Sequence, residues 1–210
     1  QGINKFKIEE TELGDLDESN FDSETEIYSF KKFINQEYHT IDYRVDFNSC
    51  YFEKIDFSKL NLDEYIFSNC YFKNCDFSNS SISSAGIHKC TFENSKFVGT
   101  DIIGTSLKNN IFLGGTLHYL NLTKSSLINI KFDNSDLSMA SINEVNLKNV
   151  IFDECKLLKA DLHHTKLRNI DLSTSSIEDI KVTLDDLVGC KINSFQAINI
   201  MISLGIDVVI

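Results

Sequence analysis

Large apolar residues recur at every fifth position through most of the chain. Thirty consecutive positions at this spacing, from Phe47 to Ile192, are apolar without exception. Residues five apart on an α-helix are rotated by about 140° and define no face, and on a β-strand they lie on opposite faces. We therefore expect the chain to turn a corner every five residues and to point one large side chain inward each time.

The positions next to each large residue support this interpretation. Two residues before it, from Val45 to Cys190, 21 of the 30 positions are Ala, Cys, Ser, Thr, Val or Gly, so a second, smaller inward side chain fits there. Two residues after it, Asn and Gly recur, and these residues best tolerate the positive φ of some tight turns. The positions are Asn69, Asn74, Asn79, Asn94, Gly99, Gly104, Asn109, Gly114, Asn129 and Asn134.

A second period of twenty residues predicts how the corners are stacked. If four five-residue sides close one square coil, thirty sides make about seven and a half coils, roughly 36 Å long at a spacing of ~4.8 Å per coil. One ladder of the core then consists of phenylalanines twenty residues apart, namely Phe52, Phe72, Phe92, Phe112, Phe132 and Phe152. The expected fold is an all-β solenoid over residues 45–194, with its core as one continuous column.

This pattern, small–polar–Leu/Phe–x–x, resembles the pentapeptide-repeat family. Residues 75–79 (Cys-Asp-Phe-Ser-Asn) and 160–162 (Ala-Asp-Leu) match the motif of that family closely. The resemblance implies a right-handed quadrilateral β-helix.

Residues 1–44 break the five-residue register and are expected to form an acidic N-terminal cap region. Ser23-Glu24-Thr25-Glu26 fits a capping box, and Ile27, Phe30, Ile34 and Tyr38 follow at helical spacing. We therefore predict a short amphipathic helix over about 24–38 that covers the open end of the rod. A partner-binding segment is the alternative, because this region contains eleven acidic and five basic residues.

Residues 195–210 are expected to form a dimerisation module. The pattern predicts a helix from about 195 to 204, a stop at Gly205 and a short apolar strand. The apolar surface exceeds what one cap would bury, which favours a two-fold homodimer. The predicted interface is Phe195, Ile198, Met201, Ile202, Leu204, Ile206 and Val208. Gln196-Ala197, Leu204-Gly205-Ile206 and Val208 resemble the C-terminal module of the quinolone-resistance (Qnr) subfamily, which implies that two rods join tail to tail.

Nothing in the sequence predicts catalysis, a cofactor or a metal site. All six cysteines, Cys50, Cys70, Cys75, Cys90, Cys155 and Cys190, fall at the small inward position, where they are expected to be buried thiols. Four of the five histidines, His88, His118, His163 and His164, fall at outward positions. There is no CxxC pair, P-loop, dinucleotide fingerprint or nucleophile elbow. We expect a protein that is not an enzyme.

The net charge of −11 argues against direct binding of nucleic acid, which requires clustered Lys and Arg. No apolar run is long enough to cross a membrane, and no leader pattern is visible, so the expected location is the cytoplasm.

The Qnr resemblance implies a protein that binds DNA gyrase or topoisomerase IV, through mimicry of DNA, and protects the enzyme from quinolones. The candidate acidic surface is Asp63, Glu64, Asp101, Glu144, Asp153, Glu154, Asp161, Asp171, Asp185 and Asp186. Two features depart from that subfamily: no loop interrupts the register, and the column through Leu107, Leu147 and Leu167 carries several Lys and Arg residues.

The alternative function is a protein-binding scaffold with no role at a topoisomerase. It is favoured by outward apolar residues, namely Ile103, Ile111, Leu113, Ile128, Ile151 and Leu158.

Overall fold

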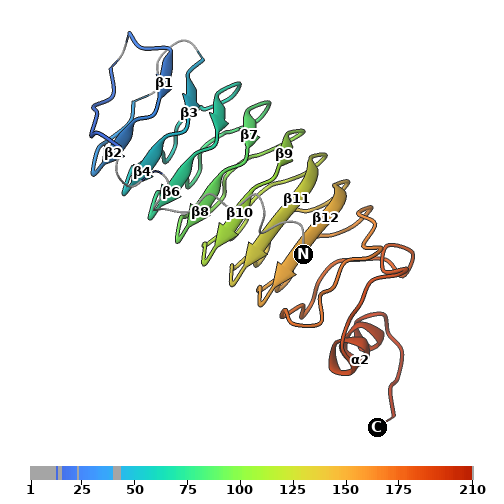
Figure 1. Ribbon diagram of the computed structural model, residues 1–210. Helices are drawn as coiled ribbons and strands as arrows, with labels where there is room; N and C mark the ends of the chain where they lie inside the picture. Colours follow the sequence, from blue (N-terminus) through green and yellow to red (C-terminus); the bar gives the residue numbers. More distant parts are fainter. Residues whose placement is uncertain (1–12, 14–15, 23, 40–43, 210) are drawn as a thin grey trace.

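The chain winds into a right-handed quadrilateral β-helix that ends in one short helix (Figure 1). The computed structural model describes residues 13, 16–22, 24–39 and 44–209. Each coil has four faces, which we number by the large inward residue: face 1 from Phe47, face 2 from Phe52, face 3 from Phe57 and face 4 from Leu62. From β3 (Asp46–Asn48) onward, residues at the same place in successive coils are twenty positions apart.

Faces 1 and 2 carry the strands, and faces 3 and 4 are built from turns joined by single bridges. Face 1 contains β3 (Asp46–Asn48), β5 (Ile66–Ser68), β7 (Gly86–His88) and β9 (Ser106–Lys108). Face 2 contains β4 (Tyr51–Glu53), β6 (Tyr71–Lys73), β8 (Thr91–Glu93) and β10 (Ile111–Leu113). The longer strands β11 (Ser126–Asp133) and β12 (Asn146–Asp153) run across the corner between the two faces.

All strand pairs are parallel, and the regular part of the solenoid makes about six turns. The register is twenty residues, as in Phe92↔Phe112 and Phe112↔Phe132. After β12 the coils continue without strands, and bridges such as Asp171↔Lys191 keep the same register.

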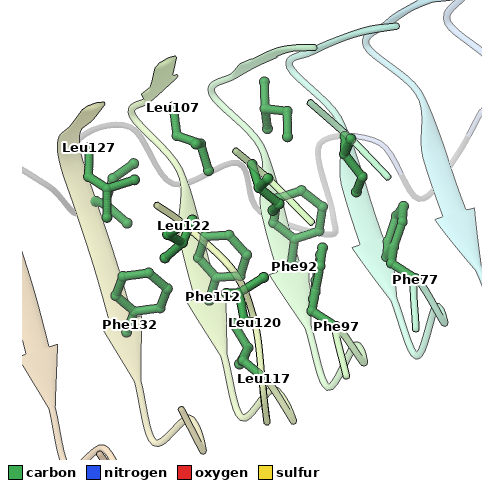
Figure 2. Packing of buried hydrophobic residues seen from close by; sticks show 14 of the residues in the cluster. Phe77, Phe92, Phe97, Leu107, Phe112, Leu117, Leu120, Leu122, Leu127 and Phe132 are labelled. Carbon is green, nitrogen blue, oxygen red and sulfur yellow. The ribbon is translucent and has the colours of Figure 1, made fainter. Parts of the chain in front are cut away.

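The predicted phenylalanine ladder is confirmed. Centroids of neighbouring rings from Phe52 to Phe152 lie 4.6 to 5.2 Å apart, with interplanar angles of 4° to 18°. Figure 2 shows Phe92, Phe112 and Phe132 pointing into the same interior as Phe97, Leu117 and Leu122. The core is thus a column of one-residue layers, in which each ring packs on the ring one coil away.

The small inward position has a polar function that we did not predict. Where this position is Ser or Thr, the side-chain hydroxyl in several coils donates to a backbone carbonyl 23 residues earlier. Thr100 Oγ1 donates to Phe77 O at 2.7 Å, and Ser125 Oγ donates to Ile102 O at 2.7 Å. The same Ser125 Oγ accepts the backbone N–H of Thr105 at 3.0 Å. These bonds satisfy backbone groups that are buried where the chain turns.

All ten Asn and Gly residues predicted at turn positions have positive φ, between 48° and 65°. Side chains of these asparagines also bond along the rod: Asn149 Nδ2 donates to Asn129 Oδ1 at 2.9 Å, and Asn129 Nδ2 donates to Asn109 Oδ1 at 2.8 Å. The Asn at this position therefore serves both the backbone conformation and the contact between coils.

Replacing Asn129 by alanine should destabilise the chain by about 1–3 kcal/mol, because it places a Cβ-bearing residue without side-chain bonds at φ 55°. Asn129→Gly is the matched control, since it loses the same side-chain bonds but accepts this φ without strain. Urea unfolding measures both variants. An equal loss of unfolding free energy in the two variants would mean that the positive φ at this position contributes nothing to the destabilisation by alanine.

The predicted helix over 24–38 is wrong. These residues contain β1 (Ile27–Ser29) and β2 (Lys32–Ile34), which pair with β3 and β4. Tyr28, Phe33 and Tyr38 point inward at five-residue steps, whereas Ile27 and Phe30, which made the pattern look helical, are 66% and 63% exposed.

This first coil is one residue short, and that is why its register was missed. Tyr28 pairs with Phe47, and Phe33 with Phe52, at a separation of 19 residues. Pairing with a preformed coil buries more aromatic surface than a free-standing amphipathic helix would. Ser23, the first residue of the predicted capping box, lies outside the described residues.

The predicted C-terminal helix is confirmed as α2 (Ser194–Ser203). Asn193 caps its N-terminus in a capping box with Gln196, and Gly205 (φ 78°) ends it in a Schellman motif, in which Ile206 N–H donates to Met201 O at 3.0 Å. Gln196 is buried and donates from Nε2 to Leu172 O and Ser175 O, so it fastens the helix to the last coil.

The short strand predicted after Gly205 does not form, because residues 206–209 have no neighbouring strand to pair with in the single chain.

Candidate partner-binding surfaces

Five of the predicted acidic residues lie on face 4, but only some of their carboxylates are free of protein contacts. Asp63 accepts from Ser81 Oγ at 2.6 Å and Ser83 N at 2.7 Å. Asp101 accepts from Asn121 Nδ2 at 2.9 Å. Glu64 and Glu144 are exposed and make no side-chain hydrogen bond or ion pair to the described residues. These two glutamates are the residues of face 4 that are best placed to meet a partner.

Asp161, also on face 4, belongs to a local network. Its carboxylate contacts His163 Nδ1 at 2.9 Å and accepts from Asn143 Nδ2 at 3.1 Å. Burial raises the pKa of Asp161, but the bonds from His163 and Asn143 lower it more, so the net pKa is below the usual value. Asp161 is therefore ionised at neutral pH, with part of its charge directed to these neighbours.

The predicted aspartates on face 2 are paired with lysines. Asp171 contacts Lys191 Nζ at 2.6 Å, and this bond, with those from Ser173, lowers the pKa of Asp171 to about 2. Lys131 Nζ lies 2.6 Å from Asp133 and 3.2 Å from Asp153. Glu154 is exposed. Because these aspartates have a cation beside them, face 2 presents a weaker negative field than its acid count indicates.

Asp185 and Asp186 differ in position. Asp185 is exposed beside Lys166. Asp186 is only 2% exposed and accepts from Thr183 Oγ1 at 2.7 Å, Lys166 Nζ at 3.1 Å and His164 N at 3.1 Å. Asp186 therefore holds the last coils together, and its prediction as a surface residue was wrong. A buried carboxylate with three donors is a structural group.

Face 1 is the basic side of the rod. Lys108, Lys148 and Arg168, which belong to the column of Leu107, Leu147 and Leu167, are exposed on it, and Lys89 is half-buried on the same face. Faces 1 and 4 therefore carry net charges of opposite sign, positive on face 1 and negative on face 4.

Four of the seven residues of the predicted dimer interface, at the C-terminal end of the rod, have exposed apolar side chains. Phe195, Ile202, Leu204 and Ile206 are 65%, 56%, 42% and 48% exposed. Ile198, Met201 and Val208 are half-buried, and Met201 packs against the core column. A groove of about 400 Å³ runs between α2 and the last turns, lined in part by Ile177, Ile180, Ile200 and Ile202. Leu184 and Val188, 55% and 64% exposed, were not predicted.

The outward apolar residues predicted for the scaffold alternative include one error. Ile111 is 1% exposed. It lies on face 2 in the row of Tyr51, Tyr71 and Thr91, which are all buried, and Leu13 and Leu16 pack on the two tyrosines. Ile103 is 40% exposed, and the other four are half-buried. Alternation along a strand predicts an outward direction, but not what lies over the strand.

Tyr119 and Met139 form an exposed apolar pair that the sequence analysis missed. They are 57% and 42% exposed, lie one coil apart on face 3, and have φ of 57° and 60°. They line a cleft of about 490 Å³ with Lys159, Asp179 and Lys181. Both residues occupy the turn position, two residues after the large inward residue, where this chain favours Asn or Gly. A large apolar residue at this position was the sequence signal that could have identified the pair.

Five of the six cysteines are buried, as predicted, and Cys190 is partly exposed. Burial raises the pKa of Cys75 to about 12 and that of Cys155 to about 11. Cys70 Sγ approaches Phe47 O at 3.4 Å, and Cys90 Sγ approaches Phe67 O at 3.4 Å, where serine and threonine hydroxyls donate in other coils. The thiols thus act as small inward groups with suppressed reactivity.

No group of three or more His, Cys, Asp or Glu side chains that could hold a metal ion occurs in the described part of the chain. Over the same residues, no helix has both the length and the apolar character of a membrane span.

Two family descriptions match the repeats. "Pentapeptide repeat region" matches residues 65–142, and "Pentapeptide repeats (8 copies)" matches residues 43–79 and 135–173. Together they extend over residues 43–173, which is more than half of the chain. No curated protein matches significantly.

Among solved structures, HetL from Nostoc sp. strain PCC 7120, a pentapeptide-repeat protein involved in regulation of heterocyst differentiation, is similar with a TM-score of 0.60 at 15% identity. That match covers 80% of this chain and 83% of HetL. A trypsin-treated variant of QnrB1, a plasmid-mediated fluoroquinolone resistance protein, matches with a TM-score of 0.43 at 16% identity, covering 87% of this chain and 98% of that one. The five-residue ladder, the square coil and the two family matches agree: the chain belongs to the pentapeptide-repeat family.

Proposed function

We propose that this protein is a non-catalytic binding rod that forms a tail-to-tail homodimer and binds a type II topoisomerase, DNA gyrase or topoisomerase IV, as a partial mimic of DNA. In this role it would protect the enzyme from quinolones. The observation that carries the proposal is face 4, where five acidic and two basic residues give a net charge of −3. Carboxylates on such a face fit a basic surface that otherwise receives phosphates.

Two further features support the proposal. Residues 196–208 resemble the C-terminal module of the Qnr subfamily, and α2 leaves Phe195, Ile202 and Leu204 exposed at the end of the rod. A two-fold dimer would cover these side chains and double the length of the acidic face.

Competition with duplex DNA tests this proposal. Purified gyrase should bind the immobilised chain, and added duplex DNA should displace the gyrase from it. Glu64→Gln with Glu144→Gln should weaken binding about tenfold at low salt, since both carboxylates are exposed and unpaired on face 4. The matched control is Glu178→Gln with Asp179→Asn on face 3, which removes the same charge and should change binding less than about twofold. Binding that DNA does not displace would contradict the mimicry.

The second candidate is a protein-binding scaffold with no topoisomerase role. The exposed pair Tyr119 and Met139 favours it, because aromatic and Met side chains are enriched where proteins meet. A variant that combines Tyr119→Ser with Met139→Asn separates the scaffold role from the topoisomerase role. Its gyrase binding should be unchanged if face 4 is the surface that contacts gyrase.

A further inference from the structure

The ladder of backbone hydrogen bonds is interrupted on faces 1 and 2 between β12 and the next coil. No backbone hydrogen bond joins residues 146–153 to residues 166–173. In earlier coils the residue equivalent to Asn149 donates to the next coil, as Asn69 N–H does to His88 O at 3.0 Å and Asn109 N–H to Ile128 O at 2.9 Å. Faces 3 and 4 of the same coils remain bonded, for example Leu157 N–H to Ser176 O at 2.7 Å. The wall is therefore open on one side only.

The opening is a cleft of about 460 Å³ whose lining includes Leu147, Val150 and Ile170. Leu147 is half-buried, whereas the ladder residues on either side of it, Leu127 and Leu167, have no exposed surface. Backbone groups that pair elsewhere in the rod face this cleft from both sides, which is the arrangement that accepts an added strand.

The exposed charges at the cleft favour an acidic segment. Lys148 and Arg168 line it and make no ion pair with the described residues. The one acidic residue of the lining, Asp171, is paired with Lys191. In a chain with a net charge of −11, two unpaired cations beside an open strand edge select an anionic side chain.

The chain itself contains a segment of this kind. Residues 206–209, Ile-Asp-Val-Val, place one acidic residue, Asp207, among three β-branched apolar residues. They follow the helix directly but form no strand, and Val209 is 96% exposed. Asp207 makes no hydrogen bond or ion pair with the described residues.

We infer that residues 206–209 of a second copy of this chain add as a strand between β12 and residues 166–171, with Asp207 beside Lys148 and Arg168. The inference rests on the proposed dimer and specifies what the tail does in it. Each tail closes the open wall of the other rod, so the solenoid is complete only in the dimer. The added strand pairs through the backbone, while Ile206 and Val208 meet the apolar lining.

Hydrogen exchange on the full chain tests this inference. The amides of Asn149, Lys166 and Asp171 should exchange at least about tenfold more slowly in the dimer than in the exposed-face variant Ile202→Glu, which should be monomeric. If light scattering shows a dimer but these amides exchange equally fast in both proteins, the tail does not occupy the cleft and only this inference fails. If the wild-type chain is a monomer, the proposed dimer fails as well.

Charge exchange provides an independent readout. Arg168→Glu and Asp207→Arg should each weaken dimerisation about tenfold, and the double variant should recover most of the loss. Lys108→Glu is the matched control, because Lys108 lies on the same face three coils earlier and outside the cleft. Equal effects of Arg168→Glu and Lys108→Glu, or no recovery in the double variant, would overturn the pairing.

Discussion

Phe112→Asp should unfold the whole rod in a single transition rather than loosen one coil. Phe112 is 2% exposed and stacks between Phe92 and Phe132 at 4.9 Å from each, with Phe97 edge-on at 5.6 Å. Removing such a ring costs about 3–5 kcal/mol, and an unpaired carboxylate in the column adds several more. The sum is comparable to the total stability of an ordinary domain, about 5–15 kcal/mol.

Circular dichroism during thermal unfolding measures this effect. Leu113→Asp is the matched control, since it places the same carboxylate one residue away on the half-exposed outer side of β10. We expect the control to retain a folded spectrum at 25 °C and Phe112→Asp to lose it. A melting curve for Phe112→Asp close to that of the wild type would refute the assignment of the ladder.

The second large effect concerns the end of the rod. Ile202→Glu should convert the proposed dimer to a monomer, because it places a charge on the exposed apolar surface of α2. Multi-angle light scattering should report 23.9 kDa for the variant and twice that for the wild type. Met201 is a less suitable probe, because its side chain packs against the core column and its replacement would also loosen α2.

The coils should remain intact in this variant, with an unchanged β spectrum, because Gln196 and Ile200, rather than Ile202, hold the helix to the last coil. Ser203→Glu is the control for added charge on an exposed residue of the same helix. Dimers of unchanged affinity in Ile202→Glu would show that α2 is not the interface.

The sequence was sufficient to predict the solenoid because its period is locally encoded. Each five-residue side carries its own large residue, small residue and turn residue, so the positive φ at Asn129 and the stacking of Phe112 follow from counting. The same counting fails where one residue is missing. Tyr28, Phe33 and Tyr38 keep the five-residue step, but they are one residue out of register with Phe47. The segment was therefore interpreted as a helix.

The surface was less predictable, since its charges act in pairs across coils. Asp171 and Lys191 are twenty residues apart, as are Asp136 and Lys156, whose charged groups lie 3.8 Å apart. The twenty-residue period contains this information, and its use would have predicted the pairing of Asp171 on face 2 and of Asp136 on face 3. The open wall after β12 has no such signal, because the repeat of large and small residues continues through it unchanged.

The most direct test of the proposed function is a gyrase supercoiling assay in the presence of a quinolone, with this protein titrated from substoichiometric to micromolar concentration. We expect the wild-type chain to restore supercoiling, and the variant Glu64→Gln with Glu144→Gln to require a higher concentration for the same recovery. The control variant on face 3 should act like the wild type. Supercoiling that stays unchanged with and without quinolone, at every concentration of the folded dimer, would contradict the topoisomerase role and favour the scaffold.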